Sequence, residues 1–450
     1  MSKKIIFLVD HKHRDFPSLC LIGLFLENYG HKVFYKNIHE PDIEIISPDI
    51  VVEGKYSRPK EWIEKIKSWQ KKNIKILVIE TEGIHQGIGF LPLKNYFCNL
   101  GFFWNKYHGY KIENFEKKNF HILGSPRIDF FHKNLRGLIK KDKILKVLGI
   151  NNKKKPIITL ATTNTYERLS KKQIKNIKTR YYKVHKSNAK FEHLLLYQKE
   201  SKNLFINFCK DILKNNYDFY LVIKPHPNED IFFWKNLIKE LGNDKRVKLM
   251  IGRPIQDLFS ISNLHVGVAG CQTIAEAGLC NIKTIELNNN SFALKKIMDK
   301  SHLNLGLYNI KSFKEIKFFF LKLLNKKIST KIYLNWRVKI STYVNLFFYK
   351  FDGNRCYEYA KIINKYLLKK ENFTEIVKEN YIEKCFYFFI KLLKTIYRNI
   401  RYKKNQIDHR GRYDNRIKED DIIAFYNKLR KINYVKSKIK KINSFNNKLS

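Results

Sequence analysis

The sequence predicts an α/β protein with two doubly wound parallel sheets, a cleft between the two domains, and a basic helical tail. Three observations lead to this fold class. Short apolar runs alternate with helical patterns, this rhythm starts twice along the chain, and most of the runs are continuously apolar, as in sheets buried on both faces. Hydrophobic residues make up 44% of the 450 residues, which is enough for a large core and excludes a mainly disordered chain.

The first series of elements fills the N-terminal third. A helix is expected from Pro17 to Tyr29 because its apolar residues recur at helical spacing and Gly30 follows as a stop signal. A second helix is expected over Lys60–Lys71. The strands of this series are expected at Ile5–Val9, His31–Tyr35, Asp49–Glu53 and Ile74–Glu80.

The second series follows a lysine-rich segment, Lys140–Lys155, which is interpreted as a linker because Pro156 ends it. Helices are predicted at Ser201–Asn215, Ile231–Leu241 and Ile255–Ser262, and strands at Ile157–Ala161, Phe219–Ile223, Val247–Met250, His265–Val268 and Lys283–Leu287. The predicted organisation is therefore an N-terminal Rossmann-like domain, a second Rossmann-like domain, a helical closing segment and a basic helical tail, over residues 1–150, 151–330, 331–370 and 371–450.

The charge balance favours anionic partners. Lys and Arg number 88 against 41 Asp and Glu, a formal charge of +47. The excess is spread from end to end, whereas nucleic-acid binders concentrate it on one face or arm, so no nucleic-acid partner is expected. Seven scattered cysteines without a CxxC pair argue against a disulfide framework and a cysteine-rich zinc site.

The predicted location is the cytoplasm, with peripheral contact to the inner face of the cytoplasmic membrane as an option. No run of about 18 apolar residues exists, and the N-terminal apolar run is too short for a signal peptide. Residues 385–404 combine aromatic, aliphatic and cationic side chains, which suits a helix on an anionic membrane. A helix packed on the main body with a solvated basic face fits the same pattern.

The sharpest local signal is Lys224-Pro-His-Pro227, which follows a buried strand directly. Ligands of open α/β sheets bind beyond the carboxyl ends of strands, and proline fixes φ. Lys224 and His226 are therefore candidates to bind a phosphate. The alternative is a proline-stiffened turn with an incidental histidine.

A second signal is Gly270-Cys-Gln-Thr-Ile-Ala-Glu276, again after a strand. Gly270 permits a tight turn, and the helix that follows offers free amides to an anion. Gln272 and Thr273 would then face a phosphate, and Glu276 could hold ribose hydroxyls. In the alternative interpretation Thr273 caps the helix and Glu276 is its charge partner.

A third signal, Glu80-Thr-Glu-Gly83, ends a strand of the first series. A carboxylate beside a glycine turn suits a general base, and Glu82 is preferred to Glu80 because it sits at the turn. The alternative is loop charge that balances the surrounding lysines.

Two weaker clusters are expected to line an acceptor pocket or the cleft. The first, Asp10-His-Lys-His-Arg-Asp15, contributes Asp10, Lys12 and Arg14. The second contributes Arg127 and Asp129, which could instead form an internal ion pair. No metal is expected, since adjacent strand-exit residues rarely make a full ligand set.

These motifs, together with Gly124-Ser-Pro-Arg-Ile-Asp129 and Phe351-Asp-Gly353, resemble those of bacterial capsule and lipopolysaccharide biosynthesis proteins with the GT-B glycosyltransferase fold. The resemblance covers roughly residues 1–368. The pattern is also similar to that of CMP-sugar-dependent transferases of the sialyl and Kdo type. It departs from theirs in that Thr81 separates the two acids and Cys271-Gln-Thr273 replaces a serine-rich turn.

The resemblance implies a metal-independent glycosyltransferase without cofactor, with a nucleotide-sugar donor, preferably a CMP-sugar, and a glycan or glycolipid acceptor. By the same resemblance Glu82 would be the base, and His226 and Thr273 would contact the donor phosphate. Three alternatives stay open: a CDP-alditol phosphotransferase, a nucleotide-sugar epimerase, and a non-catalytic scaffold of polysaccharide assembly.

Overall fold

The computed structural model divides into two compact units. The first consists of Met1–Gly83, Pro92–Leu138 and Phe347–Ser450, and the second of Ile84–Leu91 and Ile139–Leu346. Apart from Ile84–Leu91, the chain belongs to the first unit up to residue 138, to the second from 139 to 346, and again to the first from 347. The structure describes residues 2–37, 43, 45–54, 60–81, 98–105, 119–135, 138–163, 170–184, 191–214, 218–227, 229–288, 291–297, 304–310, 328–369, 389, 393 and 417–447.

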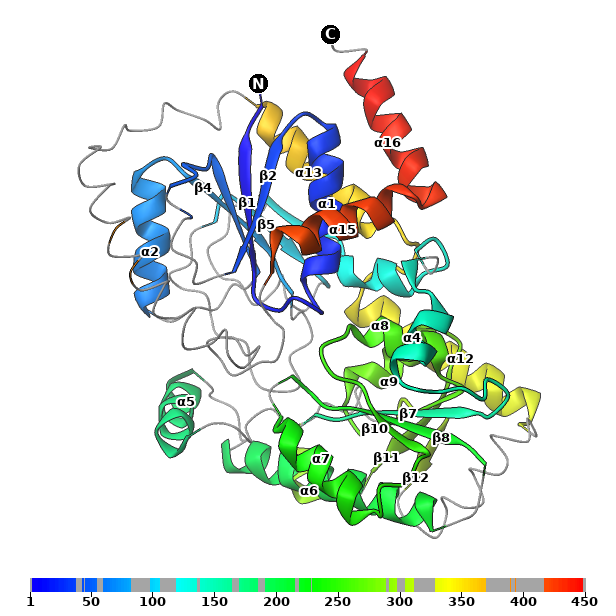
Figure 1. The fold of residues 1–450 in the computed structure, drawn as a ribbon. Helices are drawn as coiled ribbons and strands as arrows, with labels where there is room; N and C mark the ends of the chain where they lie inside the picture. The colour runs from blue at the N-terminus through cyan, green and yellow to red at the C-terminus, as the bar shows by residue number, and fades with distance from the viewer. Residues whose placement is uncertain are drawn as a thin grey trace. The chain divides into compact units, whose positions relative to one another are not determined.

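The first unit contains a fully parallel sheet, with six strands among the described residues in the order β2-β1-β3-β4-β5-β6 (Figure 1). The order reverses between β1 and β3, so the switch point of this sheet lies at the carboxyl ends of these two strands. The strands are β1 (Lys4–Val9), β2 (Lys32–Asn37), β3 (Ile50–Glu53), β4 (Lys75–Ile79), β5 (Leu100–Phe103) and β6 (Phe120–Ile122).

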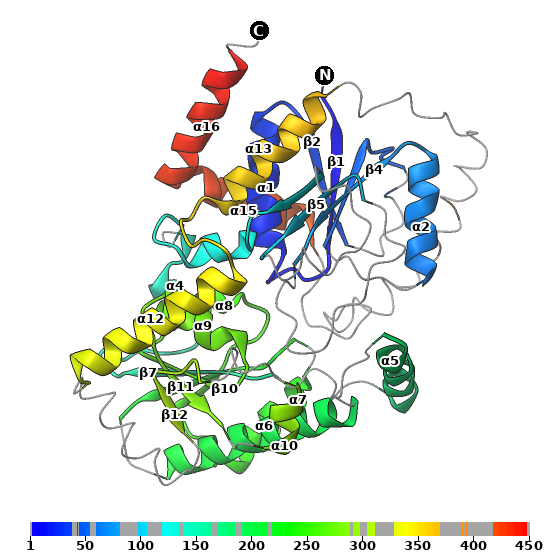
Figure 2. The same ribbon diagram turned by 180° about the vertical axis from the view of Figure 1, so that it is seen from behind.

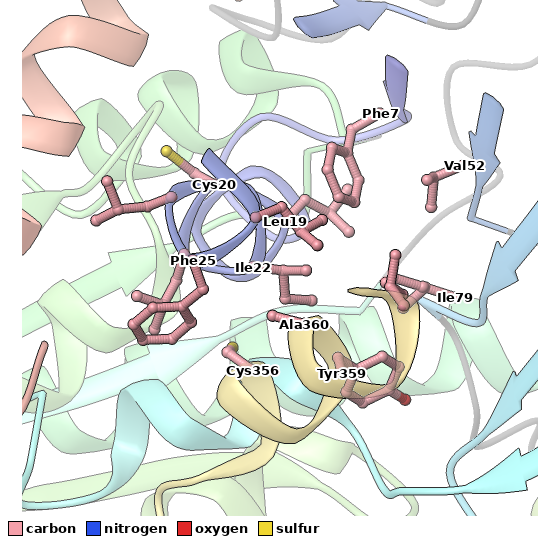
Figure 3. Close-up of a cluster of buried hydrophobic side chains, with 14 of the residues drawn as sticks. Phe7, Leu19, Cys20, Ile22, Phe25, Val52, Ile79, Cys356, Tyr359 and Ala360 are labelled. Carbon is pink, nitrogen blue, oxygen red and sulfur yellow. The ribbon is translucent and has the colours of Figure 1, made fainter. Parts of the chain in front are cut away.

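Side-chain alternation along β1 builds two cores. Ile5, Phe7 and Val9 join the cluster beneath α1 (Phe16–Asn28) and α13 (Arg355–Leu368), whereas Ile6 and Leu8 join the cluster beneath α2 (Lys60–Lys71). Figure 3 shows Phe7 and Ile79 of the sheet beside Ile22 of α1 and Tyr359 of α13. The sheet is thus covered on both faces, which explains why β1, β3 and β4 are mainly apolar.

The tail forms part of the first unit. Two helices, α15 (Glu419–Arg430) and α16 (Asn433–Asn446), pack against α1 (Figures 1 and 2). Their contribution to the core consists of Tyr426, Leu429, Val435 and Ile442. Residues 417–447 are therefore packed on the body of the protein, whereas the segment 385–404 lies, except for positions 389 and 393, outside the described residues.

The second unit has a parallel sheet in the order β12-β11-β10-β7-β8-β9, with helices on both faces (Figures 1 and 2). Read from the other edge, this is the order 3-2-1-4-5-6 of dinucleotide-binding folds, with its switch point between β7 and β10. The strands are β7 (Ile157–Ala161), β8 (Tyr220–Lys224), β9 (Val247–Leu249), β10 (Leu264–Val268), β11 (Lys283–Leu287) and β12 (Tyr308–Ile310). The helices are α4 (Lys141–Val147), α5 (Lys171–Val184), α6 (Phe191–Leu213), α7 (Ile231–Glu240), α8 (Ile255–Ile261), α9 (Gln272–Leu279), α10 (Phe292–Ile297) and α12 (Thr330–Phe347).

The two predicted doubly wound sheets are confirmed, but two local expectations were wrong. The expected linker Lys140–Lys155 contains α4, whose Ile144 and Leu145 are buried against β7 and α8. The helix expected at Ser201–Asn215 begins ten residues earlier, at Phe191. The helical region after residue 330 is two helices, of which α12 falls almost wholly in the second unit and α13 in the first. Within the described residues, no helix is long and apolar enough to cross a bilayer.

Candidate functional site

The two motifs of the second unit that are predicted to bind phosphate lie at one edge of its sheet. Lys224 ends β8, and Gly270 follows β10; β7 lies between these strands and pairs with both. Two interstrand spacings separate the motifs by about 10 Å. Since the switch point falls between β7 and β10, this edge is where a doubly wound sheet binds a ligand.

A buried carboxylate holds the loop after β8 in place. Oε2 of Glu229 accepts hydrogen bonds from Thr162 Oγ1 and from Trp234 Nε1, both at 2.6 Å. Thr162 Oγ1 accepts in turn from the backbone N–H of His226 at 2.9 Å, and the N–H of Thr162 donates to the carbonyl of Lys224 at 3.1 Å. The loop that carries His226 is therefore fixed to the end of β7.

Lys224 is a half-buried ammonium group at this edge. Burial lowers the pKa of Lys224 to about 8, and the negative charges of Asp257 and Glu229 oppose that decrease. Asp257 also forms an ion pair with Arg253 at 3.0 Å. The amine is mostly cationic at neutral pH, as an anion-binding group has to be.

The turn after β10 has the predicted conformation. Gly270 has φ +80°, in the left-handed region that favours glycine, and Cys271 occupies the N-cap of α9 in an extended conformation. The first turn of α9 begins at Gln272, so the amino end of this helix lies at this edge. Tyr197 of α6 braces the turn by donating from its hydroxyl to the carbonyl of Ala269 at 2.8 Å.

The side chain of Thr273 is engaged inside the protein. Its hydroxyl lies 3.0 Å from Nε2 of the fully buried His265, while Nδ1 of that ring lies 3.0 Å from Thr159 Oγ1. Ser262 Oγ lies 2.7 Å from Thr159 Oγ1, and both hydroxyls lie within hydrogen-bond distance of the carbonyl of Leu264, at 3.0 and 3.3 Å.

His265 is thus joined through both ring nitrogens to threonine hydroxyls, those of Thr159 and Thr273. Burial lowers the pKa of His265 to about 3, so the ring is neutral. The Thr273 hydroxyl also lies 3.0 Å from Sγ of Cys271, so the described contacts of this side chain are all within the protein.

Two other candidates of this motif contact each other. Gln272 Nε2 donates to Oε1 of Glu276 at 2.8 Å, and Glu276 is almost fully buried. Its expected contact with ribose hydroxyls stays a prediction, because the described contact is with the protein.

At the first sheet, the candidates after β1 form a charged network. Arg14 holds Asp15 with two hydrogen bonds, at 2.6 and 2.9 Å, and lies 3.8 Å from Asp10. Lys12 forms an ion pair with Asp421 of α15 at 2.9 Å. The sequence predicted these side chains as an acceptor surface; the structure shows that they fix the loop 10–15 and join it to the tail.

The other candidate residues of the first unit are Glu80, Glu82, Arg127 and Asp129. Glu80 is buried, and its carbonyl accepts from Trp104 Nε1 at 2.5 Å. Glu82, the predicted base, lies outside the described residues. Arg127 lies over the Trp104 ring, 5.9 Å from its centroid. Among the described residues, no cluster of three or more His, Cys, Asp or Glu side chains is arranged to hold a metal ion.

Asp129 has a structural position. It is fully buried, and its carboxylate accepts from the backbone N–H groups of Arg355 at 3.0 Å and Cys356 at 2.7 Å. It therefore holds the start of α13 onto the first unit.

Sequence reasoning missed three residues of the second unit's edge: Thr162, Glu229 and His265. Thr162 opens a polar segment after a buried strand, and Glu229 follows the His-Pro loop, so both carried a usable signal. His265 lies inside a strand that is otherwise apolar, which is the pattern of a buried hydrogen-bonded histidine.

Comparison with known proteins yields matches only among solved structures. No family profile and no curated protein sequence matches the chain. The wall teichoic acid polymerase TagF is 10% identical, with a TM-score of 0.48 over 81% of this chain and 88% of that one. A putative UDP-N-acetylglucosamine 2-epimerase from Listeria monocytogenes is 12% identical, with a TM-score of 0.49 over 84% and 99%. Anabaena HepE, in complex with UDP and glucose, is 11% identical, with a TM-score of 0.43 over 81% and 100%.

Proposed function

We propose that this chain is a metal-independent GT-B-type glycosyltransferase. It moves a sugar from a nucleotide-activated donor, preferably a CMP-sugar, to a surface glycan in capsule or lipopolysaccharide synthesis. The observation that carries the proposal is the position of Lys224, the His226 loop and the start of α9 around the switch point of the second sheet. The resemblance of the motifs supports the donor class.

The chemistry of this edge fits a departing nucleotide. Negative charge develops on the donor phosphate as the glycosidic bond to the nucleotide breaks, and a lysine, a histidine loop and helix amides stabilise that charge. Their positions are set before the donor binds, because Glu229 and Thr162 fix the loop. In the proposal the first unit binds the acceptor, and Glu82 removes the proton of the attacking hydroxyl.

We expect saturable binding of CMP, CDP or UDP, measured by calorimetry and thermal shift, and at least a tenfold (about 1.4 kcal/mol) loss of affinity in Lys224→Met. A control variant, Lys239→Met, removes the same charge from the exposed face of α7 and is expected to bind as the wild type does. Wild-type protein that binds none of the three nucleotides would overturn the proposal and favour a scaffold.

Glu82→Gln is expected to lower transfer by roughly 100-fold or more with unchanged nucleotide affinity, because a general base contributes 10²–10⁴-fold. The rate is measured with radiolabelled donor and acceptor glycan, and Glu80→Gln is the matched control. A folded Glu82→Gln variant with the wild-type rate would show that another group is the base. Incubation of donor alone distinguishes an epimerase, which would isomerise the sugar without acceptor.

A further inference from the structure

We infer that Glu229 is a positioning residue of the donor site, which fixes the loop of His226 through Thr162 and places a negative charge on the loop that follows Lys224. The inference rests on the proposed function, because it assigns a role at the same phosphate-binding edge. Glu229 is only 1% exposed, so it acts through its neighbours and not by touching the donor.

The positioning role follows from the hydrogen bonds. Thr162 donates its single hydroxyl proton to Glu229 at 2.6 Å, which leaves the oxygen lone pairs of Thr162 to accept the N–H of His226 at 2.9 Å. The N–H of Glu229 also donates to the carbonyl of His226 at 2.8 Å. Both the N–H and the carbonyl of His226 are therefore fixed by hydrogen bonds. The remaining freedom of this residue is rotation about its side-chain torsions.

The charge role follows from the groups around Lys224. The negative charges of Glu229, on the same loop, and of Asp257, on α8, act on Lys224, and Asp257 pairs with Arg253 at 3.0 Å. These two cations and two carboxylates balance in charge. Removal of either carboxylate charge leaves a net positive, half-buried cluster, and the pKa of Lys224 then falls below about 8.

The hydrogen bonds alone do not require a carboxylate. An amide oxygen could accept from both Thr162 and Trp234, whereas a buried carboxylate carries a desolvation cost that needs a cation to offset it. Lys224 is a cation that can do so. This asymmetry separates the two roles experimentally: Glu229→Gln keeps the acceptor oxygen and removes the charge, while Thr162→Val removes the relay and keeps the charge.

The test is calorimetric titration of the full-length variants with CMP, CDP and UDP at pH 6 and pH 8. The nucleotide phosphate itself also loses a proton between pH 6 and pH 8. This change affects all variants equally, so the variants are compared with the wild type at each pH separately. Glu229→Gln is expected to bind as the wild type does at pH 6. At pH 8 it is expected to bind roughly fivefold more weakly, the effect of a one-unit fall in the pKa of a half-protonated lysine.

The control variants assign each role. Asp257→Asn is expected to reproduce the pH-dependent loss, since it removes a charge beside Lys224 without touching Thr162. Thr162→Val is expected to weaken binding by the same factor at both pH values. These two variants measure the two roles even if Glu229→Gln does not fold.

The outcomes separate the inference from the proposed function. If the wild type binds and Lys224→Met does not, but Glu229→Gln binds as the wild type does at both pH values, the inference fails and the proposed function stands. If the wild type binds no nucleotide, both fail. A loss in Glu229→Gln that is equal at both pH values would overturn the charge role.

Discussion

Deletion of residues 417–450 is expected to unfold the first unit. The deleted helices α15 and α16 bury Tyr426, Leu429, Val435 and Ile442 against α1, and Ile417 lies beside them in the same cluster. Burial of a large apolar side chain stabilises a fold by about 1.5–3 kcal/mol, so the five together contribute on the order of 10 kcal/mol. That sum equals the whole stability of an ordinary domain.

Hydrogen exchange measured on the deletion variant checks this expectation, since β1 and β3 should lose their protection. Two matched substitutions on α15, measured by urea unfolding, test the same contribution to stability without removing the helix. Leu429→Ala, at a fully buried position, is expected to cost about 2–5 kcal/mol, whereas Ile423→Ala, 52% exposed, should cost under about 0.5 kcal/mol. Wild-type protection after deletion would show that the tail is dispensable.

The contribution of α15 and α16 to the core limits how membrane binding can be tested. If a protein without residues 371–450 did not sediment with liposomes, unfolding of its first unit would be a sufficient explanation. Charge-reversing substitutions within 385–404, in the full-length chain, test the predicted contact with an anionic membrane and leave α15 and α16 in place.

Asp129→Ala is expected to destabilise the first unit by about 3 kcal/mol, because it leaves two buried backbone N–H groups at the start of α13 without their acceptor. The control is Glu64→Ala. Glu64 pairs with Lys67 on α2, but the two side chains are 57% and 46% exposed, so its loss should cost under about 1 kcal/mol. Equal effects from the two variants in urea unfolding would contradict the structural role of Asp129.

The difference in stability between the wild type and Asp129→Ala has an expected pH dependence. Burial raises the pKa of Asp129 to about 7 against the opposing effect of its backbone donors. A carboxyl group whose folded-state pKa lies above the unfolded value favours the fold at low pH, and this contribution is lost as pH rises through 7. The difference in unfolding free energy between wild type and Asp129→Ala should therefore be larger at pH 5 than at pH 8.

Much of the fold could be read from local patterns. The helix Lys60–Lys71 and the strands Ile157–Ala161 and Lys283–Leu287 have the predicted bounds, because buried parallel strands are continuously apolar and helices keep their spacing. The strands that the sequence did not reveal are short. For example, β6 has three residues, all half-buried, and a segment of that length has no period to detect.

Local patterns also placed Lys224 and Gly270 after strands, and these residues do end or follow β8 and β10. The sequence by itself thus determined the elements and the chemical groups at their ends, because strand and helix periodicity are properties of adjacent residues.

Only the tertiary structure decided which of those groups meet. Thr162 contacts Glu229 across 67 positions, Lys12 pairs with Asp421, and Asp129 holds Arg355 across 226 positions. Such contacts depend on strand order and on where the chain re-enters a unit. The partner of a buried charge is set by the topology of the fold. The residues adjacent in sequence to that charge therefore do not indicate which distant residue will contact it.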